Sequence, residues 1–207
     1  MMKNSSHTLP SDVENNKLDL TDIDAINYME AVGIAEAKAY SFKLDQNVKI
    51  DVNLLKDLHR IAFGKLYHWA GKIRKTQTNI GVPPYQILER LKVFLDNLDY
   101  RLHFINPADE EEVISLLTEV HHIIVYIHPF VNGNGRIARL FTNLISLKLM
   151  HPPFEIYVRD NVSKSKTREN YIKAIKKADE GDYAELKELV RNAIRYSIEQ
   201  YEKMDNE

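Results

Sequence analysis

The stretch HPFVNGNGRIAR, residues 128–139, gathers the residue types that bind a phosphate. Gly133 and Gly135 can adopt backbone conformations that aim successive N–H groups at one point, which forms a nest for an anion. We expect a helix to begin near Arg136, with its positive dipole end facing the nest. Arg136 and Arg139 are three residues apart, so they share one helix face and can grip phosphate oxygens in pairs. This pattern predicts a site for a polyphosphate.

His128 opens this stretch, at a point where Pro129 breaks the preceding helix. There it could take a proton from a hydroxyl that attacks a bound phosphate. His121 and His122 are adjacent, so they point about 100° apart on a helix and would not chelate one ion together. We expect one of them in the core and one at the surface. The plain alternative is that the Gly-Asn-Gly stretch is only a turn and that the arginines lie on a solvated face.

The motif search excludes two other kinds of site. The sequence GxxxxGK[ST] does not occur, so there is no P-loop, and HExxH is absent, which excludes the zinc proteases that carry it. The chain contains no cysteine, so disulfides, thiol nucleophiles and thiolate metal sites are excluded as well.

Helices must position these residues, and the apolar residues recur at helical spacing through most of the chain. Helices are predicted over about 21–39, 53–61, 86–102, 107–126 and 136–147, with two more from about Thr167 and after Asp182. Asp51 or Asn53 can cap the second of these, and Gly181 suits the left-handed position that ends the sixth. The helix at 107–126 has a wide apolar face, which places it centrally in the core.

Residues 72–86, KIRKTQTNIGVPPYQ, interrupt the helical pattern. Gly81 permits an unusual backbone conformation, and we expect Pro83-Pro84 to stop any helix. We predict a short hairpin or flap here. The predicted fold class is therefore mainly α with one small β element.

Length and composition indicate one domain. The chain has 207 residues with a net charge of −2, which leaves no global footprint for nucleic acid or a membrane. We expect a polar N-terminal arm over residues 1–20, a single domain over 21–200 and a polar tail over 201–207. The arm lacks the apolar stretch of a signal peptide, so a cytoplasmic location is expected.

The twelve-residue stretch resembles the motif HPFx[D/E]GNGRxxR of the Fic (Fido) family and departs from it only at Asn132. The segment WAGKIRKTQTNIGVPP, residues 69–84, resembles the family's flap region. The segment RENYIKAIKKADEGDY, residues 168–183, resembles the part that closes over the nucleotide base. Within the family, the likeness is closest to bacterial proteins called mobile mystery protein B, which also carry Asn at this place. The resemblance implies a Fic fold, a helical bundle with a small β-hairpin flap.

The resemblance also implies an activity, the transfer of AMP from ATP to a Ser, Thr or Tyr hydroxyl of a target protein (AMPylation), with Mg²⁺ bridging phosphates. The resemblance implies that His128 is the general base. It implies that Gly133, Asn134 and Gly135 cradle the phosphates through backbone and amide N–H groups, and that Arg136 and Arg139 bind the β- and γ-phosphates. It also implies that Ile80 and Gly81 form the flap that docks the target, and that Tyr171 and Asp179 lie beside adenine and ribose. For Tyr171, packing as a helix aromatic is an equally good interpretation. For Trp69, core packing is the better one.

Asn132 stands where the family has an acidic residue that helps to hold Mg²⁺. An amide oxygen can ligate a hard cation but brings no charge, so Mg²⁺ binding should be weakened. Three interpretations stay open: a weakened nucleotidyltransferase, a phosphotransferase like the related Doc proteins, or a catalytically inactive nucleotide-binding or interaction module.

Control of the site is a second open question. Many Fic proteins are inhibited by a helix with the pattern [S/T]xxxE[G/N], and PSDVEN carries Glu14-Asn15 but has Pro10 where Ser or Thr should be. Glu14 is therefore a candidate inhibitory residue, although it can equally belong to a disordered arm. Alternatively, a separate antitoxin supplies the control, such as the helix-turn-helix partner that the likeness to mobile mystery protein B implies. A homo-oligomer also stays open.

Overall fold

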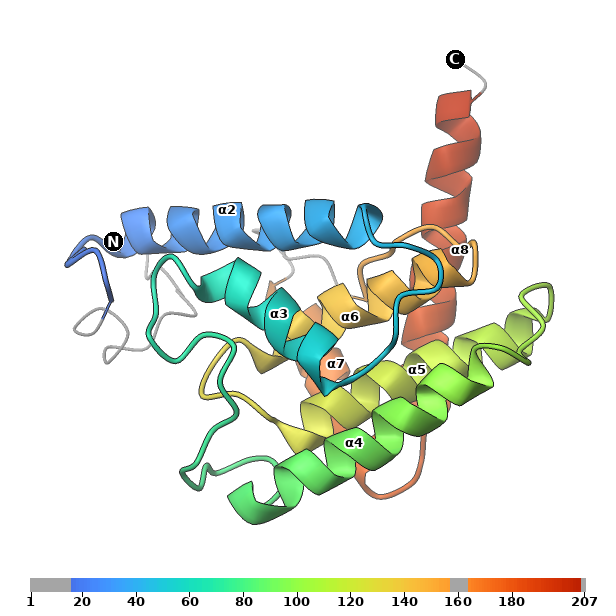
Figure 1. Cartoon of the computed structure of the whole chain (residues 1–207). Helices are drawn as coiled ribbons and strands as arrows, with labels where there is room; N and C mark the ends of the chain where they lie inside the picture. Colours follow the sequence, from blue (N-terminus) through green and yellow to red (C-terminus); the bar gives the residue numbers. More distant parts are fainter. Residues whose placement is uncertain (1–15, 157–163, 206–207) are drawn as a thin grey trace.

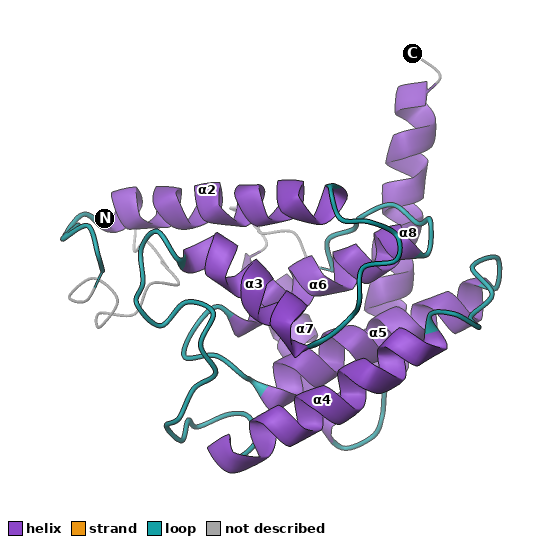
Figure 2. Ribbon diagram, in the orientation of Figure 1, coloured by secondary structure: helices purple, strands orange, loops and turns teal. Residues whose placement is uncertain are grey.

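A computed structural model of the chain describes residues 16–156 and 164–205, which form seven helices and no strand (Figures 1 and 2). The helices are α2 (Ile23–Phe42), α3 (Val52–Phe63), α4 (Pro84–Arg101), α5 (Glu110–Ile127), α6 (Asn134–Lys148), α7 (Lys164–Asp179) and α8 (Ala184–Asp205). The predicted mainly α fold class is confirmed.

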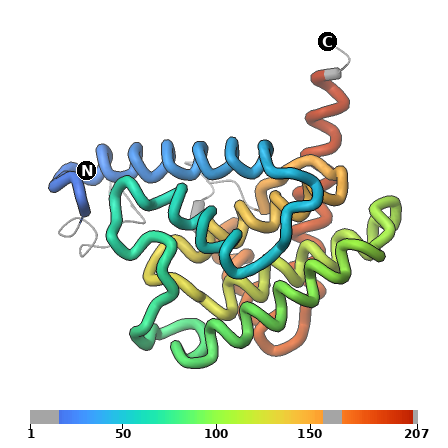
Figure 3. Tube along the Cα trace, viewed as in Figure 1, coloured from blue at the N-terminus to red at the C-terminus, as the bar shows by residue number. Residues whose placement is uncertain are grey.

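Helix α5 forms the centre of the bundle, as its wide apolar face predicts. It packs against α4, α6, α7 and α8, and most of its apolar residues are buried. Helix α2 lies across α3 and α6, while α4 runs beside α5 (Figure 1). The tube in Figure 3 shows that the C-terminal half of α8 projects beyond the rest of the molecule.

Aspartates begin three of the helices. The side chains of Asp22, Asp51 and Asp109 accept hydrogen bonds from backbone N–H groups in the first turns of α2, α3 and α5. Each carboxylate satisfies an N–H that has no partner inside the helix and faces the positive end of the helix dipole. Of the two caps predicted for α3, Asp51 is the one that forms, and Asn53 lies inside the helix.

A helix begins at the Pro83-Pro84 pair, where the sequence analysis expected helix to stop. Pro84 is the first residue of α4, two residues earlier than predicted. The first position of a helix needs no N–H donor and suits the fixed φ of proline, so Pro84 starts this helix.

The C-terminal helices differ from the prediction at their ends. Helix α7 begins at Lys164, three residues before Thr167, and α8 continues through Asp205, so most of the predicted polar tail is helix. Gly181 has the left-handed φ of 91° that was predicted between the two helices. In the part of the chain that the structure describes, no helix has the length and apolar character needed to cross a membrane.

Candidate functional site

The loop between α5 and α6 carries the predicted motif. His128 ends α5 with a left-handed φ of 53°, and Gly133 precedes α6 with a φ of 78°. A Cβ atom on Gly133 would lie 2.6 Å from Cε2 of Phe63, so both the backbone conformation and the packing require glycine here. The turn therefore fixes the direction from which α6 starts.

Gly135 does not have the unusual backbone that was predicted for it, because it lies inside the first turn of α6. The lack of a side chain at Gly135 instead leaves space over the start of α6. A Cβ atom there would meet only Nη1 of Arg139, at 3.8 Å. The space over the start of α6 is therefore open to a ligand.

The start of α6 has no side-chain cap. Its first internal hydrogen bond joins the N–H of Ile137 to the carbonyl of Gly133, at 2.9 Å. The backbone N–H groups of Asn134, Gly135 and Arg136 precede that bond, and a helix offers them no internal partner. Together with the dipole of α6, they form a site for an anion such as phosphate. Helix α6 begins two residues before the predicted Arg136.

The side chain of Asn134 holds the loop. Its Oδ1 accepts the N–H of Phe130 at 2.8 Å, and its Nδ2 donates to the carbonyl of Phe130 at 2.9 Å. One of the two amide N–H groups is thus engaged in the loop, and a phosphate contact of the other stays a prediction. The backbone N–H of Asn134 is a second group that this residue offers to a phosphate.

The side chain of Asn132 turns back on the loop as well. Its Oδ1 accepts the N–H of Gly133 at 2.7 Å. The described residues contain no group of three or more His, Asp or Glu side chains arranged to hold a metal ion. Within residues 16–156 and 164–205, the carboxylates thus do not by themselves form a Mg²⁺ site.

His59 holds the same loop from α3, and the sequence analysis did not identify it. Its Nδ1 accepts the N–H of Gly71 at 2.8 Å, so the ring proton is on Nε2, which donates to the carbonyl of Asn132 at 3.1 Å. The ring stacks on Phe130 with 3.7 Å between centroids. Burial lowers the pKa of His59 to about 3, so the ring is neutral. Its position among the apolar residues of the α3 stripe was the signal in the sequence.

His128 is arranged as a base. Its Nδ1–H donates to the carbonyl of Val125 at 3.3 Å, and no described residue bonds to Nε2. Burial lowers the pKa of His128, the bond to Val125 opposes this, and the charge of Arg74 lowers the pKa further. The ring is therefore neutral at pH 7, with the lone pair of Nε2 available to take a proton.

The predicted hairpin or flap is a loop without strand among the described residues, and Arg74 holds it against the motif. The guanidinium donates from Nε to the carbonyl of His128 at 2.7 Å and from Nη2 to the carbonyl of Val82 at 2.5 Å. Its backbone N–H donates to the carbonyl of Pro129 at 2.9 Å. Arg74 is 2% exposed and was also missed by the sequence analysis. In the sequence, the only indication of this role was an arginine within the predicted flap.

The predicted docking residues of the flap lie beside His128. Gly81 has a φ of 92°, and a Cβ atom on it would lie 2.4 Å from Cβ of His128. Ile80 is 62% exposed next to it. The flap therefore presents an apolar side chain to solvent at the edge of the candidate base.

Arg136 forms an ion pair that was not predicted. Its Nη1 donates to Oε2 of Glu30 at 2.5 Å, and its guanidinium lies 4.5 Å from the centre of the Phe63 ring. Glu30 is 3% exposed and also accepts the hydroxyl of Tyr67 at 2.9 Å. Glu30 offsets the charge of Arg136, so the anion site is less positive than two arginines suggest. A glutamate in the buried stripe of α2 was the signal that the sequence offered.

The two predicted base-lining residues bind to α5. The hydroxyl of Tyr171 lies 2.8 Å from Nε2 of His121, and Oδ1 of Asp179 lies 2.8 Å from Nε2 of His122. Both histidines are buried, which corrects the expectation that one lies at the surface. These partners make burial of both rings possible. Packing is thus the better interpretation of Tyr171.

Two further predicted residues complete the account. Trp69 packs against the core and stacks on Tyr67 with 4.4 Å between ring centroids, as core packing predicts. Glu14, the candidate inhibitory residue, lies outside the described residues.

Comparisons with known proteins agree with this geometry. Residues 49–146 match the model of the Fic/DOC family. The chain is 29% identical over 181 residues to protein adenylyltransferase fic-1 of Caenorhabditis elegans, which covers 83% of this chain and 33% of that protein. It is 28% identical over 183 residues to protein adenylyltransferase Fic of Nematostella vectensis, covering 85% of this chain and 40% of that protein. The chain thus spans about a third of the length of these curated relatives.

Solved structures show the same fold. A fragment of Fic-1 from C. elegans aligns with a TM-score of 0.72 and 26% identity, covering all of this chain and 65% of that one. BepC, a Bartonella tribocorum effector solved with bound AMPPNP, aligns with a TM-score of 0.66 and 18% identity, covering 93% of this chain and 94% of that one. The Fic fold is confirmed by these alignments, while a β-hairpin flap is not seen among the described residues.

Proposed function

We propose that this chain, in which residues 49–146 form a Fic/DOC family domain, transfers AMP from ATP to a Ser, Thr or Tyr hydroxyl of a target protein. The names of the relatives, protein adenylyltransferases, support this activity. The single observation that carries it is the position of His128, whose neutral ring leaves Nε2 open beside the uncapped start of α6.

In the proposed reaction, the N–H groups of Asn134, Gly135 and Arg136 hold phosphate oxygens of ATP. The target hydroxyl gives its proton to Nε2 of His128 while its oxygen forms a bond to the α-phosphorus. The bond from the α-phosphorus to the bridging oxygen breaks, and pyrophosphate leaves. Negative charge develops at the helix start, where fixed N–H groups and the dipole stabilise it.

The two motif arginines have unequal roles in this proposal. Glu30 offsets the charge of Arg136 and fixes its guanidinium over Phe63, so Arg136 orients the phosphates more than it attracts them. Arg139 lies over the start of α6 near Gly135 and supplies attraction for the β- and γ-phosphates. Mg²⁺ would be held mainly by the phosphates of ATP, because the described part of the chain offers no carboxylate cluster for it.

The flap supplies the docking surface for the target segment in this proposal. Ile80 is exposed and Gly81 touches His128, so a segment that covers Ile80 would bring its hydroxyl to Nε2. Arg74 fixes the distance between this surface and the base, since it joins the flap to the carbonyl of His128.

Transfer of label from ATP tests the function directly. Full-length chain is incubated with cell lysate and ATP labelled at the α-phosphate or, separately, at the γ-phosphate, with His128→Ala as the control. We expect protein to be labelled from the α-phosphate only, and only by the unmodified chain. Label from the γ-phosphate would indicate a Doc-type phosphotransferase. No label from either position would contradict transfer and favour an inactive nucleotide-binding module.

Inhibition by Glu14 remains a proposal that a deletion can test. Removal of residues 1–15 and the substitution Glu14→Gly should both raise ATP affinity and transfer if Glu14 opposes phosphate binding. Calorimetric titration with ATP measures the affinity, and Glu14→Gln is the matched control for charge. Unchanged affinity in both variants would favour control by a separate antitoxin-like protein.

A further inference from the structure

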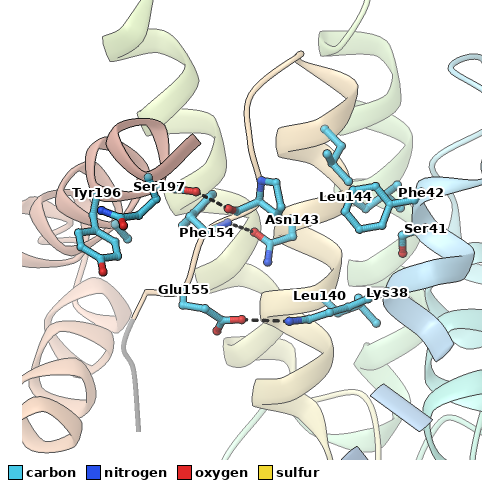
Figure 4. A pocket seen from close by; sticks show the side chains of 14 residues that line it. Lys38, Ser41, Phe42, Leu140, Asn143, Leu144, Phe154, Glu155, Tyr196 and Ser197 are labelled. Carbon is cyan, nitrogen blue, oxygen red and sulfur yellow. Dashed lines mark hydrogen bonds and ion pairs between the residues drawn. The ribbon is translucent and has the colours of Figure 1, made fainter. Parts of the chain in front are cut away.

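A cavity of about 290 Å³ lies between α2, α6, α8 and the segment over residues 153–155. Figure 4 shows its walls, which are mostly apolar and include Phe42, Leu144, Phe154 and Tyr196. Helix α6 contributes residues from Leu140 onward, so none of residues 128–139 lines it. This space is separate from the phosphate site at the start of the same helix.

The side chain of Asn143 places an unused hydrogen-bond donor at the cavity. Its Oδ1 accepts the backbone N–H of Phe154 at 2.9 Å, which decides which way the amide faces (Figure 4). Nδ2 therefore lies on the other side, and none of the described residues accepts a hydrogen bond from it. Asn143 is only 7% exposed. The amide nitrogen itself is reached by solvent, so its N–H groups face the open cavity and can donate to an acceptor from outside the chain.

Two other polar groups of the cavity already have partners. The hydroxyl of Ser41 donates to the carbonyl of Ala37 at 3.0 Å, and that of Ser197 donates to the carbonyl of Pro153 at 2.7 Å. Tyr196 and Gln200 also bring polar groups to the cavity, but both side chains are more exposed than Asn143, which is the most buried group able to direct a ligand by hydrogen bonding.

The charged groups at the cavity offset each other. Nζ of Lys38 and Oε1 of Glu155 form an ion pair at 3.1 Å, and both side chains are about half exposed. A ligand therefore does not need to carry a charge. What the walls require is apolar surface and one acceptor oxygen.

A second cavity of about 570 Å³ continues from the first, and the two share Phe42, Leu144, Leu147 and Pro153. This second cavity reaches Met150 and Tyr201, which are exposed apolar residues. The second cavity gives a bound ring or chain apolar surface beyond the first one. Large exposed apolar patches of this kind mark binding sites on soluble proteins.

We propose that this cavity binds an uncharged apolar molecule with a carbonyl oxygen, of the class of aryl ketones, amides and esters. The carbonyl accepts a hydrogen bond from Nδ2 of Asn143, and the apolar part packs against Phe42, Leu144 and Tyr196. Asn143 is nine residues after Asn134, which places it about 14 Å along α6 from the phosphate site. The proposal does not rest on transferase activity, because no residue is shared between the two sites.

Two ligands of nearly the same shape test the hydrogen bond. Acetophenone has the carbonyl oxygen, and cumene replaces this oxygen by a methyl group. Both are titrated into the full-length chain at pH 8, with binding followed by ligand-observed NMR. We expect both to bind saturably. In Asn143→Asp, which keeps the acceptor for Phe154 but loses the N–H donors, the ratio of acetophenone to cumene affinity should fall about tenfold.

Ala193→Phe is a second variant, which fills the cavity from α8 and should weaken both ligands at least tenfold. Melting temperature and ATP binding confirm that each variant is folded. The proposal is overturned if neither ligand saturates with the unmodified chain, if Ala193→Phe binds both as before, or if Asn143→Asp leaves the affinity ratio unchanged. The ratio stays interpretable when Asn143→Asp lowers stability, because both ligands are measured on the same folded protein.

Discussion

Helix α5 contains His121 and His122 and is capped by His128, and the three rings differ in burial and partners: His121 keeps an unpaired Nδ1, but it is completely buried. His122 has partners on both ring nitrogens, since Nε2 donates to Asp179 and Nδ1 accepts the hydroxyl of Tyr183 at 2.9 Å. His121 is fully buried against Tyr171. His128 bonds only to its own helix through Nδ1, and no described residue bonds to Nε2.

The difference shows how one residue type serves both structure and chemistry. Side chains of α7 and α8 occupy the rings in the middle of α5, so those histidines hold the bundle together. His128 caps α5 with a left-handed backbone, at the start of the loop that leads into α6. Chemistry is possible where a polar atom keeps an unused lone pair or N–H near another such group.

The largest expected effect is a loss of AMP transfer when His128 is replaced, and it distinguishes this histidine from the two that pack in the bundle. His128→Ala should lower AMP transfer by about 10²–10⁴-fold, because the target hydroxyl loses its general base. ATP affinity should change less than threefold, since the base contacts the target and not the phosphates. Labelled transfer and calorimetry measure the two quantities. His128→Asn, which tolerates the left-handed backbone better than alanine, controls for strain.

Tyr183→Phe is the matched control on the structural side of the comparison. It removes the hydroxyl that donates to His122 and should lower the free energy of unfolding by about 1 kcal/mol. Transfer per folded molecule should stay the same. Transfer at the normal rate by His128→Ala, or a hundredfold loss in Tyr183→Phe, would reverse the roles assigned here.

The free energy of unfolding should fall in acid, because buried histidines resist protonation in the folded chain. Burial lowers the pKa values of His59 and His121 from 6.5 to about 3. Between those values the unfolded chain binds protons that the folded chain does not, so stability is full above pH 6.5 and falls as the pH drops toward 3. Each histidine should remove about 1.4 kcal/mol per pH unit in this window.

Urea unfolding at pH 7.5, 6 and 5 measures this slope. His59→Gln should make it shallower, because one of the two neutral histidines is gone, although the starting stability will be lower. An identical slope in that variant would mean that His59 is not the group that resists protonation.

The sequence predicted the parts of the site that depend on neighbours along the chain. His128, Gly133 and the start of α6 follow from local rules about helix ends and left-handed turns. The sequence did not predict Glu30 and His59, which reach the loop from α2 and α3. Their contacts depend on how three helices cross, which the spacing within one helix does not specify.

The same reasoning explains the errors in the sequence analysis. Arg74 holds the predicted flap against the motif, and its partners could not be read from the local pattern of residues 72–86. His122 was expected near the surface as an alternative to His121, because Asp179 and Tyr183 belong to a distant part of the chain. An adjacent pair of histidines reveals neither partner.

A third test compares the two arginines. Arg139→Ala should weaken ATP binding about 10–100-fold and AMP binding less than threefold, because its proposed partners are the β- and γ-phosphates. Calorimetry with both nucleotides measures the difference. Arg136→Ala is a poorer probe, since it leaves the carboxylate of Glu30 buried without its partner and lowers stability. Equal weakening of ATP and AMP by Arg139→Ala would move this residue away from the outer phosphates.

The smallest expected effect concerns Asn132, whose Oδ1 already accepts the N–H of Gly133. Asn132→Asp keeps that bond with little change of shape and places a negative charge next to the start of α6. The free energy of unfolding should therefore rise by about 0.5 kcal/mol. Thermal unfolding measures this gain, and peptide mass spectrometry should accompany it, because an Asn-Gly pair can deamidate to the same residue.

The change in ATP affinity caused by Asn132→Asp should depend on whether Mg²⁺ is present. With EDTA present, the added carboxylate repels the phosphates, and ATP affinity should fall about threefold, as expected for one added charge at a partly exposed site. With Mg²⁺ present, the carboxylate and the phosphates can share the cation, so affinity should recover and transfer should need less Mg²⁺ than in the unmodified chain. An identical response to EDTA and Mg²⁺ in both proteins would place position 132 outside the reach of the phosphates. The anion site would then consist of the N–H groups of α6 and Arg139, without a part for Asn132.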